Sequence, residues 1–556
     1  MVSTQLSLFE KPEINNHIAE TYTGIYSTHK YWSKKPFNII RDFVLKYSEK
    51  GEIVLDPFCG SGISITESIF TGRKAIGIDI NPAAIFITKQ MLNKVSCKRL
   101  IEVYKELEKK CKEKINNFYI VNREGKNFIG THFLWENGNL VEVWYKSGCG
   151  KNNKIVDSPK QEDVNLANSF SYEKIPYYYP KRNFFHNSRI NADRNKHIYE
   201  LFTPRNLMAL SFLLDSIEKI EDKEIRDIFK FAFTSSVGQA SRMVFVVKKR
   251  GKFNGQFRKI ERKEVGSWVI GYWIPKEHFE INVWNCFENK FKKILKAKKE
   301  QEHANYEIIE ANNFEELVNT NKNLLMINDS AISVLKTMPD NSIDYVITDP
   351  PHGNRIPYLE QSMIWNEWLK KDVNYDDEIV ISESKDRNKD IDNYYFLLNQ
   401  VLKNIERILK PNRYFSLMFN SLDDETWINL IKIMNELHFD LHKIETLSYS
   451  ANSVVQDTRG GGLKTDFIFT FKKNPNKLKK SVELLSIKKH EEIIKDKIDL
   501  CINSSYNGLE LYEILNKLII DLLKQNTFFK LSEVVEFIRK NYKNENNKWT
   551  KKVKYE

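Results

Sequence analysis

The segment Asp349-Pro350-Pro351-His352 combines residue types that could hold an amino group for reaction. It follows Ile343–Thr348, an apolar run that predicts a buried strand. The Asp349 carboxylate and the Pro350 carbonyl could each accept one N–H of a planar amine, which would localise the nitrogen lone pair and stabilise the charge that develops on attack. The prolines stiffen the loop, and the His352 ring could stack on a heterocycle. The segment therefore favours chemistry at an aromatic amine; the alternative is a rigid turn.

A second loop, Asp56–Gly62, follows the apolar run Ile53–Leu55. Its glycines permit positive φ and a close backbone approach at the carboxyl end of a strand, where open α/β sheets bind ligands. Asp79 ends the next predicted strand, and its carboxylate could accept both hydroxyl hydrogens of a ribose. Residues 60–65 lack the third glycine of a dinucleotide fingerprint, which argues against a nicotinamide cofactor. The residues predicted to bind a cofactor here are Asp56, Phe58, Gly60, Gly62, Asp79 and Asp329.

Alternating apolar strands and amphipathic helices around both loops predict a doubly wound, mostly parallel α/β sheet. The rhythm stops after Asp79 and resumes at Leu324, and so long a gap must carry structure of its own. We therefore predict a discontinuous α/β domain, residues 1–97 and 321–475, a mixed α+β insertion, residues 98–320, and a helical C-terminal region, residues 476–556.

Lysine and arginine number 86 against 74 acidic residues, a net charge of +12, which favours a polyanionic partner such as nucleic acid. A lysine-rich proteome is the alternative explanation. The six cysteines form no C-x-x-C pair, so we expect no structural zinc site. The sequence shows neither a signal peptide nor a long apolar run, and we expect a cytoplasmic protein without membrane contact.

The two loops resemble the motifs of the amino-group DNA methyltransferases, which modify adenine N6 or cytosine N4. The resemblance implies the class I methyltransferase fold, a seven-stranded sheet with one antiparallel strand, and S-adenosyl-L-methionine as cofactor. Residues 28–36 are similar to the family's segment over the methionine end of the cofactor, which adds Lys30, Tyr31 and Trp32 to the predicted cofactor site. Leu201–Leu207 and Asn282–Trp284 resemble bacterial adenine-specific methylases, some of which carry a zinc ribbon; the cysteine pairs of that ribbon are missing here.

Two further features bear on the resemblance. The aromatic residue expected after Asp-Pro-Pro is His352, whose ring stacks less strongly than tyrosine and titrates near neutral pH. The chain order, with the cofactor loop first and a large insertion before the chemistry loop, is similar to one permutation of the family in which the insertion reads DNA.

A target base inside a duplex must be flipped out to reach such a loop. The densest basic segment, Arg242–Lys263, lies in the insertion and interleaves phenylalanines, Asn254 and Gln256 with its cations. The alternative is a solvated, lysine-rich hairpin. The residues predicted to contact double-stranded DNA are Lys248, Lys249, Arg250, Lys252, Arg258 and Lys259.

The sequence thus favours a DNA adenine-N6 methyltransferase, because family members that act on cytosine N4 more often carry serine in place of Asp349. Cytosine N4 and structured RNA remain alternatives within this class. A different class is a non-catalytic DNA-binding subunit that keeps the fold, against which Gly60, Gly62, Asp79 and Asp349 argue. No nuclease motif is evident, which favours the methylating half of a restriction–modification or phage-defence system, partnered with a cognate endonuclease or defence proteins.

Overall fold

The computed structural model describes residues 17–148, 153–249, 252–253, 256–257, 262–353, 356–419, 424–448, 466–477, 483–503, 505, 508–524, 527–545 and 548–551. Three of the predicted DNA contacts, Arg250, Arg258 and Lys259, lie outside these residues.

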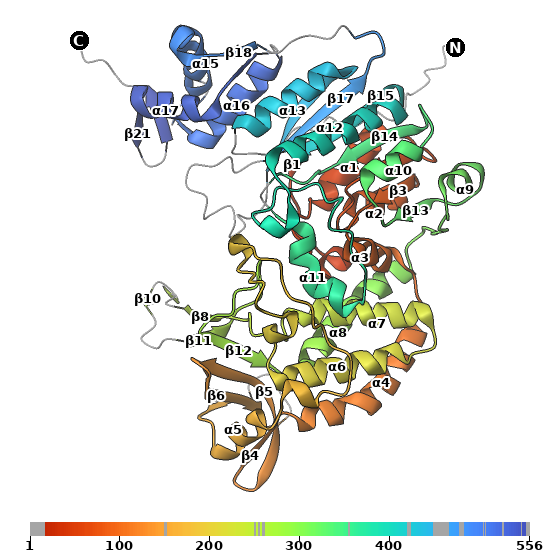
Figure 1. The fold of residues 1–556 in the computed structure, drawn as a ribbon, viewed down its shortest axis with the longest axis vertical. Helices are drawn as coiled ribbons and strands as arrows, with labels where there is room; N and C mark the ends of the chain where they lie inside the picture. The colour runs from red at the N-terminus through yellow and green to blue at the C-terminus, as the bar shows by residue number, and fades with distance from the viewer. Residues whose placement is uncertain are drawn as a thin grey trace, which may run out of the picture.

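A largely parallel sheet forms the centre of the molecule (Figure 1). Its strand order is β1-β16-β17-β15-β14-β2-β3-β13. All neighbours are parallel except that β17 runs antiparallel to β15 and β16. The strands are β1 (His17–Ile18), β2 (Ile53–Asp56), β3 (Lys74–Ile78), β13 (Leu324–Ile327), β14 (Ile343–Thr348), β15 (Leu409–Phe419), β16 (Phe439–Ser448) and β17 (Asp466–Lys473). The prediction of a mostly parallel α/β sheet is confirmed.

Helices cover both faces of this sheet, which is why its central strands β2 and β14 are buried at every position. In β2, Val54 points into the core that contains α1 and α3, whereas Leu55 points into the core that contains α10 and α12. The covering helices are α1 (Phe37–Tyr47), α2 (Ile63–Phe70), α3 (Pro82–Leu92), α10 (Ala331–Thr337), α11 (Tyr358–Trp368), α12 (Ile391–Ile408) and α13 (Asp424–Glu436).

The chain between β3 and β13 forms a separate sheet and a set of long helices (Figure 1). Its five-stranded sheet has the order β12-β5-β6-β7, with β4 paired to β5. The elements are α4 (Cys97–Asn117), β4 (Ile120–Arg123), β5 (Lys126–Glu136), β6 (Asn139–Lys146), β7 (Lys154–Asp157), α5 (Gln161–Asn168), α6 (Pro204–Glu218), α7 (Lys223–Val237), β8 (Val246–Lys249), β9 (Lys252–Phe253), β10 (Gln256–Phe257), β11 (Arg262–Val265), β12 (Glu277–Ile281), α8 (Val283–Glu302) and α9 (Phe314–Asn319).

A buried ion pair joins this sheet to its helices. Arg205, at the start of α6, donates through Nε to Glu280 of β12 at 3.0 Å and also pairs with it through Nη2. Both side chains are 1% exposed. Because an isolated buried charge is very costly, each residue needs the other, and the pair fixes α6 against the strand.

The C-terminal region contains strands as well as helices, so the prediction of a purely helical region is incomplete. Its helices are α15 (Glu491–Asn503), α16 (Leu511–Lys524) and α17 (Leu531–Asn541), and its strands are β18 (Glu483–Leu485), β19 (Leu509–Glu510), β20 (Thr527–Phe529), β21 (Tyr542–Glu545) and β22 (Lys548–Lys551). These elements lie beside α13 (Figure 1), where the Trp427 and Phe528 rings stack at 6.3 Å. Asp424 also accepts the backbone N–H of Leu531 at 2.5 Å.

No helix within the described part of the chain is both long and apolar enough to span a bilayer.

Candidate functional site

One pocket at the carboxyl edge of the central sheet brings the two predicted loops together. It encloses about 900 Å³ between the surrounding atoms, part of it open to solvent. The residues that line it from the predicted sets are Tyr31, Trp32, Asp56, Phe58, Gly60, Asp79, Asp349 and Pro351. The strands β2 and β14 are direct neighbours, so the loops that follow them meet at one edge.

The first wall of the pocket carries two carboxylates that are held by neutral donors. Asp56 accepts from Thr348 Oγ1 at 2.7 Å, from the Phe58 N–H at 3.0 Å and from the Ser64 hydroxyl. Burial raises the pKa of the Asp56 carboxyl to about 6, although these bonds oppose the rise. The bond from Thr348 also ties the end of β14 to the end of β2.

Asp79 follows β3 and accepts two backbone N–H groups, from Gly60 at 2.8 Å and from Asn81 at 2.8 Å. Burial raises the pKa of its carboxyl to about 7. Asp79 therefore holds the glycine loop in place, and its carboxylate lines the pocket where a hydroxyl-bearing ligand could donate to it.

The glycine loop closes against an aromatic ring. Gly60 has φ +49°, and a Cβ there would lie 3.2 Å from Tyr31 Cε1. Gly62 has φ +73° at the N-terminal cap of α2, and a Cβ there would lie 2.2 Å from Thr88 Cγ2. Gly60 thus permits the close approach of Tyr31, whereas Gly62 is required by packing beneath the loop and does not line the pocket.

The opposite wall carries Asp349 in an ion pair with a lysine. Lys35 Nζ lies 3.0 Å from Asp349 Oδ2 and 2.9 Å from Asp466 Oδ2, and it bridges the two carboxylates. The Lys35 and Asp349 side chains are 8% and 15% exposed. The other oxygen, Asp349 Oδ1, is buried, has no hydrogen-bond partner among the described residues and lies 2.9 Å from His352 Nε2.

His352 does not take the position predicted for it. Its side chain is 6% exposed, packs edge-on against Phe419 at 5.4 Å and does not line the pocket. Its Nε2 lies 2.9 Å from Asp349 Oδ1 without the alignment of a hydrogen bond. In this arrangement His352 supports the Asp349 loop from behind. The Pro351 carbonyl, which accepts from Tyr394 Oη at 2.6 Å, is fixed in the same way.

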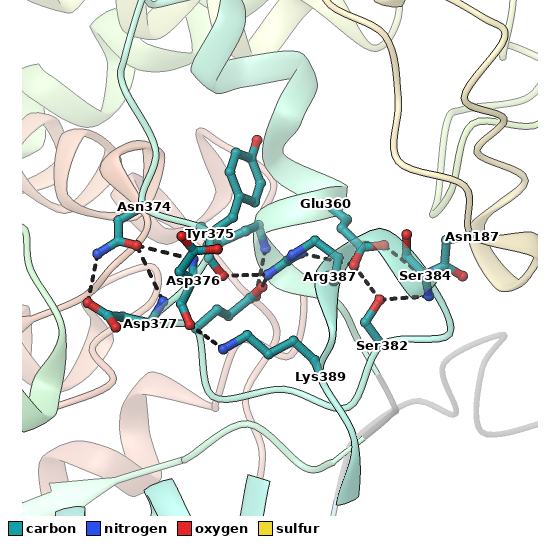
Figure 2. Close-up of polar contacts among 12 residues, drawn as sticks. Asn187, Glu360, Asn374, Tyr375, Asp376, Asp377, Ser382, Ser384, Arg387 and Lys389 are labelled. Atoms are coloured by element: carbon teal, nitrogen blue, oxygen red, sulfur yellow. Dashed lines mark hydrogen bonds and ion pairs between the residues drawn. The ribbon is translucent and has the colours of Figure 1, made fainter. Parts of the chain in front are cut away.

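A third wall comes from the segment between α11 and α12, through Asp377, Glu378 and Ile379. Figure 2 shows the buried polar network that holds this segment, with Arg387 beside Glu360. Arg387 pairs with Glu360 at 3.0 Å and with Glu378 at 2.6 Å, and it donates to the Tyr375 carbonyl at 2.9 Å. One guanidinium thereby fastens the pocket wall to α11.

Asn187, from the insertion, donates to Glu360 at 2.6 Å and joins the same network (Figure 2). Ser382 donates to the other oxygen of Glu360 at 2.6 Å. The pocket wall is therefore anchored to the insertion as well as to the central sheet.

Several predicted residues lie away from the pocket. Lys30 is absent from the pocket lining and donates to the carbonyl of Trp268 at 2.6 Å and to that of Val269. Asp329 is exposed and lines a neighbouring hollow with Asn328 and Asp372. Pro350 is not among the lining residues.

The basic segment forms a hairpin, in which β8 pairs antiparallel with β11. Lys248 pairs with Glu277 at 2.9 Å, and Lys263 pairs with Glu142 at 2.5 Å. Lys249 lies at the end of β8, and Lys252 begins β9. Part of the positive charge of the hairpin is thus balanced locally.

The sequence prediction left out three residues that line the pocket, Lys35, Tyr358 and Glu378, and the ion-pair partner of Lys35, Asp466. Lys35 lies in residues 28–36, the segment that resembles the family's cofactor-covering segment. Its place in that segment is the signal that could have identified it as a pocket residue. Asp466 begins β17, far along the chain, and only the sheet topology brings it to Lys35.

The comparisons with known proteins match DNA methylases over parts of the chain. A family model described as DNA methylase, of the N6/N4 class, matches residues 6–90. The type II methyltransferase M.MjaII of Methanocaldococcus jannaschii is 24% identical over 212 residues, which is 37% of this chain and 38% of the relative. The DNA adenine methyltransferase YhdJ of Escherichia coli is 43% identical over 56 residues, which is 10% of this chain and 18% of the relative.

A solved structure assigned as a DNA modification methylase from Thermus thermophilus is 12% identical and covers 30% of this chain and 60% of its own, with a TM-score of 0.16. The chain spans about two fifths of the length of M.MjaII and less than a fifth of YhdJ. The family model covers the segment that holds Tyr31, Asp56, Gly60 and Asp79. By these matches the chain is similar, over part of its length, to the amino-group DNA methyltransferases.

Proposed function

We propose that this chain is an S-adenosyl-L-methionine-dependent methyltransferase that acts on the N6 amine of adenine in a specific sequence of duplex DNA. One observation carries the proposal: a single pocket joins the Gly60–Asp79 wall, suited to a cofactor, to the carboxylate of Asp349, suited to an amine. The central sheet supports it, because apart from the two-residue β1 its seven described strands include one antiparallel strand, β17, as in the class I methyltransferase fold.

The residues present fit the cofactor. Asp79 offers a carboxylate for ribose hydroxyls, Tyr31 and Phe58 offer aromatic and apolar surface, and Gly60 allows close backbone approach. Asp56 adds a second acceptor. When bound, S-adenosylmethionine supplies an electrophilic methyl group on a sulfonium. The pairing of carboxylates and aromatic rings suits a cation with sugar hydroxyls better than a phosphate-bearing cofactor.

Asp349 would act on the amine. Its oxygen Oδ1 would accept one N–H of the target in place of its contact with His352, which would localise the nitrogen lone pair and stabilise the positive charge that forms on methylation. Lys35 holds the other oxygen, Oδ2, and so fixes the carboxylate in one orientation. Most of the rate would come from alignment of the reacting groups in the pocket.

The depth of Asp349 supports base flipping as part of this proposal. Its side chain is only 15% exposed and sits among pocket walls, so a base stacked within a duplex cannot reach it.

The insertion, residues 98–320, would hold the duplex, and its basic hairpin would contact phosphates. Charge reversal across Lys248, Lys249 and Arg250 is expected to weaken DNA binding and to reduce the salt dependence of the binding constant. An unchanged salt dependence would place the contact elsewhere.

The biological role that follows is DNA modification in the cytoplasm, as the methylating member of a restriction–modification or phage-defence system. The partners would be double-stranded DNA and a cognate endonuclease or defence protein. In the domain arrangement that supports this role, residues 1–97 and 321–475 carry catalysis, and residues 476–556 dock on α13 through the Trp427–Phe528 contact.

The decisive experiment is modification-detecting sequencing of DNA from cells that express the chain, with the Asp349→Ala variant as control. The expected result is N6-methyladenine in one sequence motif, absent from the control. Chromatography of the nucleosides separates this product from N4-methylcytosine. Unmodified DNA in cells with soluble wild-type protein would overturn the proposal, and transfer to RNA in vitro would then favour the RNA alternative.

A further inference from the structure

The segment after β11 exposes a tight group of apolar side chains. Val269 is 39% exposed, Ile270 is 38% exposed and Trp273 is 54% exposed. Single exposed apolar residues are ordinary, but three within five positions form a small patch that water solvates poorly. No contact within the described parts of the chain removes this patch from solvent.

The backbone beneath the patch is firmly held. Trp268 Nε1 donates to the Gly271 carbonyl at 2.6 Å, and the Gly271 N–H donates to Gln361 Oε1 at 3.0 Å. Tyr272 Oη lies 2.8 Å from the carbonyl oxygens of both Glu360 and Gln361, which share its one hydrogen. The segment is therefore a fixed turn on α11 that presents apolar side chains outward.

The turn requires its glycine. Gly271 has φ +72°, and a Cβ there would lie 2.8 Å from the carbonyl oxygen of Ile190. The Tyr272 N–H donates to the same oxygen at 2.7 Å. The chain thus bends sharply just after Ile270, which places Val269 and Ile270 at the tip.

This tip lies beside the candidate active pocket. Trp32, which lines the pocket, donates through Nε1 to the Val269 carbonyl at 3.2 Å. Lys30 donates to the carbonyls of Trp268 and Val269. The helix that carries the turn, α11, begins with Tyr358 and Leu359, which also line the pocket. Val269 is one hydrogen bond from the pocket wall.

Basic residues stand on both sides of the turn along the chain, and two of them, Lys248 and Lys263, are ion-paired. The Gly266 N–H donates to the Phe245 carbonyl at 2.8 Å, so the segment leaves directly from the hairpin that carries Lys248 and Lys263. Lys276 is exposed on the far side of the turn. An apolar turn that continues from a lysine-bearing hairpin matches a partner with an anionic exterior and an apolar interior, and a DNA duplex has both.

We propose that Val269 and Ile270 form a wedge that enters the base stack of duplex DNA next to the nucleotide that is extruded into the pocket. The wedge would fill the gap left by the extruded base and so hold the duplex in the open state. This inference rests on the proposed function, and it adds the residues that make base extrusion favourable.

The test uses the full-length protein with Val269→Ala and Ile270→Ala combined, on duplexes that contain the recognised motif. On a fully paired duplex, kcat/KM is expected to fall about tenfold to a hundredfold. On the same duplex with an abasic site opposite the target base, extrusion costs less, and the variant is expected to recover to within about threefold of wild type. Fluorescence of 2-aminopurine at the target position should rise less with the variant than with wild type.

A matched control is Val156→Ala in β7, because Val156 is 51% exposed on the insertion and lies in a different strand. It is expected to leave both substrates unaffected. If the double variant unfolds, as judged by its melting temperature, Ile270→Ser replaces it. An equal loss on paired and abasic duplexes, or no loss on either, would overturn the wedge. Absence of methyl transfer by the wild-type protein would instead overturn the proposed function.

Discussion

The two walls of the pocket hold their carboxylates in different ways. Asp56 and Asp79 accept only from hydroxyl and backbone N–H groups, and burial raises their pKa values to about 6 and about 7. Asp349 instead pairs with the ammonium of Lys35. The first wall can exchange a proton when a ligand arrives, whereas the second is held as a fixed ion pair. We call the wall with Asp56 and Asp79 the cofactor wall and the wall with Asp349 the amine wall. Ligand binding at the cofactor wall should therefore depend on pH, whereas the action of the amine wall should depend on the charge of Lys35.

The largest effect should come from Asp349→Ala. It removes the acceptor for the target amine, and the rate of transfer should fall by about three orders of magnitude. The cofactor dissociation constant, measured by calorimetry, should stay within a few-fold of wild type because the opposite wall is intact. The control is Asp466→Asn, which keeps the Lys35–Asp349 pair. Full turnover by Asp349→Ala would refute the assigned role.

Gly62→Ala should damage the cofactor wall alone. The added Cβ would lie 2.2 Å from Thr88 Cγ2 in a backbone conformation with φ +73°, so the loop must move. We expect cofactor affinity to fall by about tenfold to a hundredfold, by calorimetry, with DNA affinity little changed in a gel-shift assay. Adding Thr88→Gly relieves the clash but leaves the strained φ, and it should restore part of the affinity. Cofactor binding equal to wild type in the single variant would contradict a role for this loop.

The pH dependence of cofactor binding isolates Asp79. The pKa of its carboxyl is raised to about 7, above that of an unfolded aspartate, so the free protein loses stability as pH rises from about 4 to 7. Hydroxyl donors favour the carboxylate, so binding should release a proton below pH 7. Cofactor affinity should rise about tenfold from pH 6 to pH 8 and then level. Asp79→Asn should bind more weakly and lose this slope; a slope that persists would assign the proton to another group.

Lys35→Met should have the smallest effect on turnover and the clearest effect on the amine wall. It leaves Asp349 and Asp466 close together without their shared cation. We expect kcat to fall about fivefold at pH 7 and the acidic limb of the pH–activity profile to move to higher pH. The cofactor dissociation constant should not change. A pH profile identical to that of wild type would show that Lys35 does not orient Asp349.

The sequence predicts the motif-bearing half of the molecule well because its signals are local. Each strand that ends in a carboxylate, such as β2 before Asp56 and β14 before Asp349, is an apolar run bounded by a glycine or proline loop. Parallel pairing then brings the loops to one edge. The family resemblance contributed the cofactor and the target base, which periodicity alone does not contain.

The parts that escaped prediction depend on contacts between distant residues. Lys35 meets Asp466 across most of the chain, and Arg387 meets Glu360 and Glu378 inside a buried network. His352 was expected to face a base, but Phe419 at the end of a neighbouring strand gives its ring a place in the core. The C-terminal strands, such as β18 and β20, are each only three residues long, too short to give a sequence pattern.

The register between β3 and β13 has a consequence for synthesis on the ribosome. These strands pair along four residues, from Leu324 beside Ala75 to Ile327 beside Ile78. One edge of β3 therefore stays unpaired during synthesis until the whole insertion and then β13 have been translated. During that interval the edge can template association with another nascent chain. Early folding of the insertion, which returns the chain to the vicinity of β3, would shorten that vulnerable period.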